Sequence, residues 1–434
     1  MKTRYKVLAF LFLVSTISYL DRVCLSVAGP SMQSDLGLRP DQWGWVVGSF
    51  VLTYALFAVP TASLGDRYGA RKVLTLIVLW WSAFTFLTGA ARNYPMLIVT
   101  SLLFGLGESG AYPNAIGALS RWFPKAERAR AVGVVWMAAR IGGAVAPIMV
   151  VPILKAHGWR APFYMFAGTG LVWAAVWYGW YRDNPAEKKG LKPLELEELQ
   201  KEAKTAAGPG HAGAPWALVL RNRNVQYLMA MYFAYCFGGY FYQSWLPTYL
   251  VKGRGFTQAQ MAVWSSLPFI LGACGNLIGG ATSDFLGKKY GLKIARRTVG
   301  AAGLGMAGLL ELAAMLTHNS TLAAIFLGFG FGFMDCMMPA SWAACLDIGR
   351  KYAGTVSGAM NMAGQTGSFL SSIVFGYMVR AFGSYDLPLV PMAIALFIAS
   401  SLWLKIDPTK SLVPERSTYD PRTPAPRGSP GCLQ

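Results

Sequence analysis

Residues 61–72 read TASLGDRYGARK, and residues 279–297 read GGATSDFLGKKYGLKIARR. Each stretch follows an apolar run and sets an aspartate, Asp66 or Asp284, between small residues and a group of basic residues. The two aspartates are 218 positions apart, about half of the 434-residue chain. A signature that recurs at corresponding points indicates a duplicated architecture, with a binding site between the two repeats.

The composition predicts a chain that lies in a lipid bilayer. Hydrophobic residues make up 54% of the sequence and charged residues only 14%, with a mean hydropathy of +0.38, whereas soluble domains carry about 25% charged residues. Apolar runs of about 20 residues, the length that spans a bilayer, recur along the whole chain. We predict an all-α membrane protein with twelve transmembrane helices in two pseudo-symmetric six-helix bundles, near residues 7–28, 43–64, 73–91, 95–118, 132–154, 162–181, 226–250, 261–283, 298–316, 321–346, 353–379 and 385–405.

Polar segments divide the chain into domains. Residues 182–225 are the one long polar stretch between predicted helices, and we predict a cytoplasmic linker there, between bundles at 1–181 and 226–405. Within the linker, LKPLELEELQKEA at 191–203 has the pattern of a short amphipathic surface helix. The tail at 406–434 is rich in Pro and Arg without apolar periodicity, which predicts disorder.

The net charge of +19 is explained by membrane topology. With a cytoplasmic N-terminus, the predicted inside segments hold 30 of the 39 Lys and Arg residues and the outside loops hold 7. This bias follows the positive-inside rule, so it predicts that both termini face the cytoplasm and that the protein is integral to the inner membrane. We therefore exclude nucleic acid as a partner and expect a monomer in the lipid bilayer.

Charged residues interrupt the first apolar run, where residues 15–30 read STISYLDRVCLSVAGP. A charge at the bilayer centre costs roughly 2.5–3.5 kcal/mol on insertion scales, so such residues usually face a protein interior and act there. Tyr19 lies three residues before Arg22 and shares its helix face, which makes the two a donor pair for a carboxylate. Asp21 points about 100° away and cannot address the same point. The alternative is that Arg22 reaches from a helix boundary into water.

A second intramembrane acid is Glu108, in SLLFGLGESGAYPNAIGAL at 101–119. Burial favours the neutral carboxyl, so Glu108 is a candidate to bind and release a proton, with Asp21 as the second candidate. Gly105, Gly107 and Gly110 allow another helix to come close. The alternative is a Glu108 that forms a permanent structural bridge with an arginine.

Arg140 is a further intramembrane cation, with no acidic neighbour in its own helix. It suggests a second anionic group on the substrate, or a partner such as Glu108, and packing against Glu108 is a competing interpretation. Asp335, in GFMDCMMPASW at 332–342, is another intramembrane acid, and the sequence leaves open whether it faces a cavity.

These residues carry a resemblance. LGDRYGARK at 64–72 resembles the loop between the second and third helices of the major facilitator superfamily. Within it, the chain resembles the anion:cation symporters, which include bacterial hexuronate, galactonate and glucarate carriers, sialin and the vesicular glutamate transporters. The matching segments cover both halves and are YLDR at 19–22, GESGAYP at 107–113, SWLPTYL at 244–250 and PASWAACLD at 339–347, with SGAMN at 357–361.

The resemblance implies roles for particular residues. Arg22 is expected to contact the substrate anion, and Glu108 resembles the family's proton-binding glutamate. Trp342 and Asn361 match residues that contact sugar hydroxyls in the resembling galactonate carrier. From their side-chain chemistry, Gln243 and Tyr54 are expected to add an amide and a hydroxyl, and bundle packing explains each of the four residues as well. A conformational latch is expected at the cytoplasmic ends of the helices, formed by Asp66, Arg67, Gly69, Arg71 and Asp284.

The sequence therefore predicts a secondary transporter that imports an organic anion, with sugar acids (hexuronates, aldonates or aldarates) first, by proton symport through alternating access. Metal ligands, catalytic nucleophiles and cofactor motifs are not expected, and neither is an enzyme. The alternatives are a uniporter or exchanger, a sodium-coupled carrier of a dicarboxylate or aromatic carboxylate, and a nutrient sensor that does not transport.

Overall fold

The computed structural model describes residues 2–188, 191, 197 and 216–412, without the side chains of Val59, Asp66, Lys125, Ala126, Ala129 and Lys351. In this part of the chain the regular secondary structure is helical, which confirms the predicted all-α class. Six helical segments are long and apolar enough to cross a membrane. The count of twelve crossings stays a prediction.

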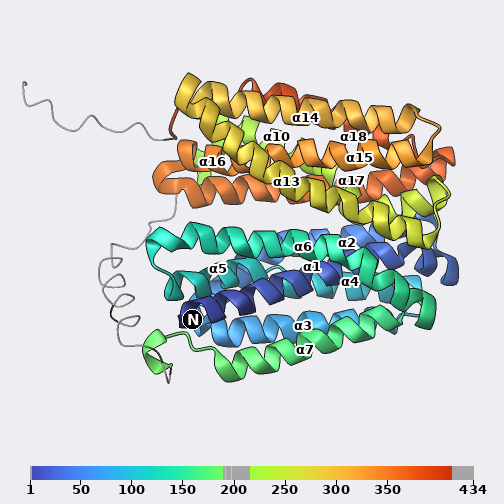
Figure 1. Cartoon of the computed structure of the whole chain (residues 1–434), viewed down its shortest axis with the longest axis horizontal. Helices are drawn as coiled ribbons and strands as arrows, with labels where there is room; N and C mark the ends of the chain where they lie inside the picture. Colours follow the sequence, from blue (N-terminus) through green and yellow to red (C-terminus); the bar gives the residue numbers. More distant parts are fainter. Residues whose placement is uncertain (1, 189–190, 192–196, 198–215, 413–434) are drawn as a thin grey trace, which may run out of the picture.

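The helices form two groups, one on each side of the long axis in Figure 1. The N-terminal half contains α1 (Thr3–Asp35), α2 (Pro40–Tyr68), α3 (Ala70–Gly89), α4 (Tyr94–Glu108), α5 (Ala111–Trp122), α6 (Lys125–His157) and α7 (Ala161–Trp180). The C-terminal half contains α10 (Arg223–Gly239), α13 (Gln258–Tyr290), α14 (Leu292–Leu316), α15 (Ser320–Cys336), α16 (Met338–Gly349), α17 (Ala353–Phe382) and α18 (Leu389–Trp403). Short elements connect them: η1 (Pro185–Glu187), α9 (Trp216–Arg221), α11 (Phe241–Ser244), α12 (Leu246–Thr248), the π-helical η2 (Tyr249–Gly253) and η3 (Arg350–Tyr352).

Proline breaks two of the expected helices next to an acidic residue. The helix expected at 95–118 is split into α4 and α5 just after Glu108, and Pro113 has no N–H to donate to the carbonyl of Ser109. The helix expected at 321–346 is split into α15 and α16, where Pro339 likewise cannot donate to the carbonyl of Asp335. Both breaks place a carboxylate at the point where a helix is discontinuous.

At a third helix break, a hydrogen bond joins the two halves. The helix expected at 226–250 becomes α10, α11, α12 and η2, and Pro247 cannot donate to the carbonyl of Gln243. That carbonyl accepts a hydrogen bond from the Ser26 hydroxyl of α1 instead. The proline therefore frees a backbone acceptor that the other half of the molecule uses.

The halves are tied together at the end where α1 ends and α2 begins, which we call the distal end; the N-terminus lies at the opposite end (Figure 1). A Cβ on Gly44 of α2 would lie 2.6 Å from the carbonyl oxygen of Ser372 in α17, so only glycine permits this approach. Side-chain contacts also join the halves here: Arg380–Asp41 at 2.9 Å, Trp45–Tyr377 at 3.3 Å, Gln33–Thr248 at 3.3 Å and Lys252–Gln33 at 3.2 Å. Contacts between the halves thus close the distal end.

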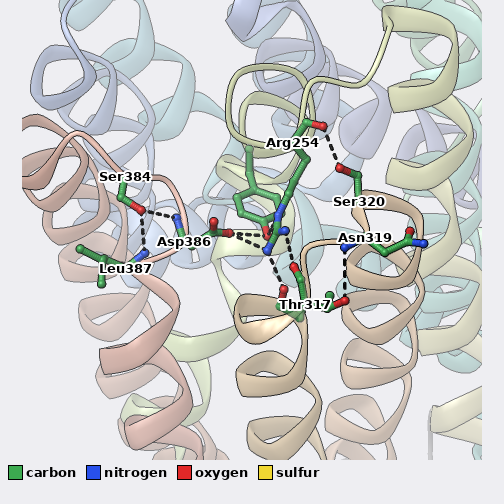
Figure 2. A network of polar contacts seen from close by, with 9 residues as sticks. Arg254, Thr317, Asn319, Ser320, Ser384, Asp386 and Leu387 are labelled. Atoms are coloured by element: carbon green, nitrogen blue, oxygen red, sulfur yellow. Dashed lines mark hydrogen bonds and ion pairs between the residues drawn. The ribbon is translucent and has the colours of Figure 1, made fainter.

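Arg254 fixes the loops of the C-terminal half at the distal end, as Figure 2 shows. Its guanidinium donates to the carbonyls of Ala314 at 2.6 Å and Thr317 at 2.7 Å, at the end of α14, where a cation is favoured by the helix dipole. It also forms an ion pair with Asp386 at 2.8 Å and donates to the Tyr249 hydroxyl at 2.7 Å. One buried cation thus joins η2, α14 and the loop before α18.

The linker and tail differ in part from the expectation. Residues 216–221 of the expected linker form α9, and most of the helix expected at 191–203 lies outside the described residues. Ile406 and Leu412, placed in the disordered tail, are buried, and the Leu412 N–H donates to the carbonyl of Ile348 at 2.8 Å. The tail is therefore packed against α16 through residue 412, because its first residues include apolar side chains that complete the core.

Candidate functional site

Arg22 and Glu108 form an ion pair between α1 and the end of α4. The Arg22 Nε donates to Glu108 Oε2 at 2.9 Å, and the Ser18 hydroxyl, one turn before Arg22, donates to the other carboxylate oxygen. The Glu108 side chain is fully buried and that of Arg22 is 16% exposed. The glycines explain the approach of the helices: a Cβ on Gly105 would lie 2.2 Å from the carbonyl oxygen of Phe50 in α2.

Aromatic rings surround the Arg22 guanidinium. Its central carbon lies 4.7 Å from the ring centroid of Tyr54, 5.1 Å from that of Phe50 and 5.3 Å from that of Tyr19. Such cation–π contacts hold a guanidinium without neutralising it. The Nη2 atom of Arg22 is buried and makes no hydrogen bond among the described residues, so the cation keeps an unused donor. The predicted Tyr19, Arg22, Tyr54 and Glu108 thus lie together.

Asp21 lies apart from this pair. Its side chain is buried, and neither carboxylate oxygen has a hydrogen-bond partner in the described part of the chain. It points to a different side of α1 from Arg22, as the helical period requires. An acid buried without partners is stable in its neutral form, so Asp21 stays a candidate proton site rather than an anion ligand.

Arg140 pairs with Asp335 and not with Glu108. Its Nη2 atom lies 2.7 Å from Asp335 Oδ2, and this ion pair joins α6 of one half to α15 of the other. The interpretation that Arg140 packs against Glu108 is therefore wrong, because Arg22 already occupies that carboxylate. Asp335, whose orientation the sequence left open, is fully buried at this contact between halves.

Sequence analysis missed two groups. Tyr240, between α10 and α11, packs against the buried cluster of the N-terminal half that includes Tyr19 and Phe50, and so brings the C-terminal half next to the site; its only signal was its place three residues before Gln243. Glu311 of α14 is fully buried beside the Tyr242 hydroxyl, without a basic partner among the ion pairs of the described residues. Its signal was a lone acid within the run expected at 298–316.

The other residues predicted in the C-terminal half are half-buried. Trp342 meets Tyr232 edge-on, with ring centroids 6.4 Å apart, while Gln243 contributes its backbone carbonyl to Ser26. No contact of the Gln243 or Asn361 side chain with Arg22 or Arg140 is found in the described part of the chain. Their expected role in holding hydroxyl groups stays a prediction.

The predicted latch is organised around a residue that the sequence analysis did not single out. Asp183, after α7, accepts hydrogen bonds from the backbone N–H groups of Ala70 at 2.7 Å and Arg71 at 3.2 Å and pairs with Arg121. Its carboxylate thus sits at the N-terminus of α3, where the helix dipole favours an anion. A Cβ on Gly69, which has φ +84°, would lie 2.4 Å from this carboxylate.

Of the remaining latch residues, Arg67 and Asp284 are exposed and Arg71 is half-buried. The Arg71 side chain donates to the carbonyl of Tyr178 at 2.8 Å, and Arg67 lies over its neighbour Tyr68. Asp284 is 76% exposed and lies 4.0 Å from Arg296. The Asp66 side chain lies outside the described residues, so its expected part in the latch stays a prediction.

The arrangement suits binding and proton transfer rather than catalysis. Groups of three or more His, Cys, Asp or Glu that could hold a metal ion are absent from the described residues. Two buried carboxylates each face a guanidinium, and both lie at helix breaks, at the ends of α4 and α15. In secondary transporters, substrate and coupling ions bind at such discontinuous helices between the repeats.

Fold and site together define an integral membrane protein of the secondary transporter class. The chain belongs to the major facilitator superfamily, whose family model matches residues 11–372. The fold agrees, because the crystal structure of a bacterial homologue of the human lysosomal transporter Spinster, inward-facing and unoccupied, superposes with a TM-score of 0.76 at 20% identity, over 93% of this chain and 96% of that one.

Relatives in sequence are transporters of organic anions, and none of those named here is an enzyme. A "Probable sulfoacetate transporter" of Cupriavidus necator is 34% identical over 412 residues, 94% of each chain. The hexuronate transporter of Bacillus subtilis is 30% identical over 389 residues, 89% of this chain and 90% of that one. A "Probable galactarate/D-glucarate transporter" of Escherichia coli K12 is 27% identical over 428 residues, 93% of this chain and 94% of that one.

Proposed function

We propose that this protein imports an organic anion together with protons by alternating access. The observation that carries the proposal is the Arg22–Glu108 ion pair, a cation with an unused buried donor beside a buried carboxylate. Arginine binds a carboxylate through two parallel hydrogen bonds and stays charged at any physiological pH. A substrate carboxylate that binds Arg22 takes the place of Glu108.

Proton coupling follows from the burial of Glu108. Once a substrate anion satisfies Arg22, the fully buried Glu108 has no neighbouring cation and keeps only the Ser18 hydroxyl as donor, which is costly unless the carboxylate takes up a proton. Substrate and proton then favour each other's binding by the same coupling free energy. Asp21 is the second candidate for this proton because it is equally enclosed.

The cargo class rests on the relatives and on the aromatic site. Sugar acids lead, because hexuronate and galactarate/glucarate transporters are related over nearly the whole chain. Aromatic rings and hydroxyls around Arg22 suit the C–H faces and hydroxyl groups of a polyol. The relationship to a probable sulfoacetate transporter favours a second candidate cargo, a short sulfonated carboxylate.

We further propose the architecture that this mechanism needs. Joining α4 with α5, α15 with α16, and α10 through η2 across their breaks gives twelve crossings in two six-helix bundles, with both termini cytoplasmic in the inner membrane of a bacterium. With that orientation the closed distal end faces outward, so the site opens toward the cytoplasm. Release of the latch around Asp66, Arg67, Gly69, Arg71 and Asp284 accompanies inward opening, and the monomer is the transporting unit.

The proposal predicts uptake driven by a pH difference. The full chain is reconstituted in proteoliposomes and offered radiolabelled glucuronate, galactonate, galactarate and sulfoacetate, with the outside made acidic. At least one of these anions should accumulate, and dissipating the pH difference with a protonophore should abolish the accumulation. Substitution of a sodium gradient should not restore it.

Each other outcome contradicts a stated part of the proposal. Accumulation driven by the sodium gradient would show that sodium, and not the proton, is the coupling ion. Equilibration without accumulation makes the protein a uniporter or exchanger. If the protein neither moves nor binds any of the four anions, the proposed cargo class is wrong, and a sensor that does not transport is favoured.

A further inference from the structure

The Arg140–Asp335 ion pair resembles the Arg22–Glu108 pair but bridges the two halves. Asp335 is fully buried, while the Arg140 side chain is 17% exposed. Both arginines lie near the middle of a long helix, Arg22 in α1 and Arg140 in α6, and both acids lie at helix breaks. The molecule therefore carries two guanidinium groups, each matched by one buried carboxylate, although one pair would suffice for an anion with a single charge.

Besides Arg140, two donors of the C-terminal half hold Asp335 in place. The Tyr235 hydroxyl of α10 donates to Oδ1 at 3.2 Å, and the Asn276 amide of α13 donates to Oδ2 at 3.2 Å. A Cβ on Gly272 would lie 2.7 Å from Oδ2, so α13 can approach the carboxylate only with glycine there. Asp335 thus keeps two donors when Arg140 leaves it.

Tyr19 links the helices that carry the two cations. Its ring centroid lies 5.3 Å from the central carbon of the Arg22 guanidinium. A Cβ on Gly142, two residues after Arg140, would lie 3.1 Å from the Cβ of Tyr19, which fixes the two helices in close contact. The helices of the two cations therefore touch at Tyr19, and a short molecule with an acidic group at each end is the cargo that would address both.

We infer that Arg140 is a second anion subsite, and that the preferred cargo is a short dianion whose second acidic group, a carboxylate or sulfonate, displaces Asp335. The inference rests on the proposed function and deepens it by naming the substrate class. Asp335 then takes up a proton from solvent, so a dianion travels with one proton more than a monoanion. In the loaded protein, each of the two arginines therefore pairs with one acidic group of the substrate instead of with its own carboxylate.

The charges around Asp335 support this exchange. Arg140 faces it from α6, Tyr235 and Tyr232 face it from α10, and Cys336 is its neighbour on α15. The phenols and the thiol are neutral near pH 7. Arg140 is thus the cation that keeps Asp335 ionised, and its transfer to a substrate anion favours protonation of Asp335.

Paired probes test the inference on the purified full chain. Binding is measured by calorimetry for galactarate against galactonate and for sulfoacetate against isethionate, where each second molecule has a hydroxymethyl group in place of one carboxylate. In the wild type, each dianion should bind at least about tenfold more tightly than its partner. Arg140→Gln should remove this ratio while keeping monoanion binding at Arg22.

Asp335→Asn tests the exchange itself. It frees Arg140 permanently, so dianion binding should tighten about tenfold at alkaline pH, and proton uptake on binding should fall by one per dianion. The double variant Arg140→Gln/Asp335→Asn leaves no unpaired charge, so it should fold even if Arg140→Gln does not. Like Arg140→Gln, it should bind a dianion no more tightly than the matching monoanion. Arg160→Gln, which breaks the exposed Arg160–Asp35 pair, should keep the ratio.

Two results would overturn the inference. One is a dianion ratio that survives in the double variant; the other is no ratio in the wild type. If wild type binds neither glucuronate nor any of the four probes, the proposed function itself has failed. If every variant binds the monoanions and the wild type shows no preference for the dianions, the proposed function stands and only the second subsite is rejected.

Discussion

Arg22→Ala should abolish uptake of the organic anion while the protein still reaches the membrane. The substitution removes the cation that pairs with Glu108 at 2.9 Å and lies among three aromatic rings. Truncating one partner of a buried charge pair costs about 2–5 kcal/mol, so we expect the affinity to fall at least about 30-fold. Uptake in proteoliposomes and binding by calorimetry measure the loss.

The control must separate binding from folding. Arg22→Ala leaves Glu108 without its partner, so Arg22→Ala/Glu108→Gln is compared with it, since this double variant has no unpaired buried charge. Arg92→Ala, at an exposed loop arginine, should transport like the wild type. A double variant that elutes as a folded protein and binds the anion with wild-type affinity removes Arg22 from the site.

Glu108→Gln uncouples transport from the proton. The amide resembles the protonated carboxyl permanently, so it leaves Arg22 free to bind substrate at any pH. The variant should exchange substrate across the membrane in counterflow, yet fail to accumulate it under a pH difference. In the wild type, one proton per monoanion and one pH unit support about a tenfold concentration ratio.

Glu311→Gln is the matched control for this substitution. Glu311 is also a fully buried acid, but it lies in α14 and makes no described contact with Arg22. It should keep pH-driven accumulation. If Glu108→Gln keeps it as well, the coupling proton belongs to Asp21 or another acid. If Glu108→Gln loses both counterflow and accumulation, Glu108 has a structural role.

The sequence predicted the class of fold and the core of the site because both rest on local patterns. Long apolar runs and the loop repeated after 218 residues indicate helices and duplication without any three-dimensional information. Tyr19 and Arg22 share a face through the helical period, and the glycines before Glu108 predicted close contact with a neighbouring helix. These residues meet in the structure for those reasons.

The partners of Arg140 and of the latch could not be predicted in this way. Arg140 and Asp335 are 195 positions apart, on helices of different halves, and several acids were equally available to Arg140 in the sequence. Asp183 binds the N-terminus of α3 only because α7 returns next to it. Such pairings depend on how the helices pack, which hydrophobic periodicity does not specify.

The most direct test of the account counts protons while the substrate binds. Galactonate, a monoanion that engages Arg22 alone, is titrated into the purified protein in buffers of different ionisation enthalpy, at several pH values around neutrality. The account predicts that the wild type takes up about one proton per galactonate and that Glu108→Gln takes up none. Galactonate binding without proton uptake in the wild type, or with equal uptake in Glu108→Gln, would contradict the claim that Glu108 couples the proton to the anion.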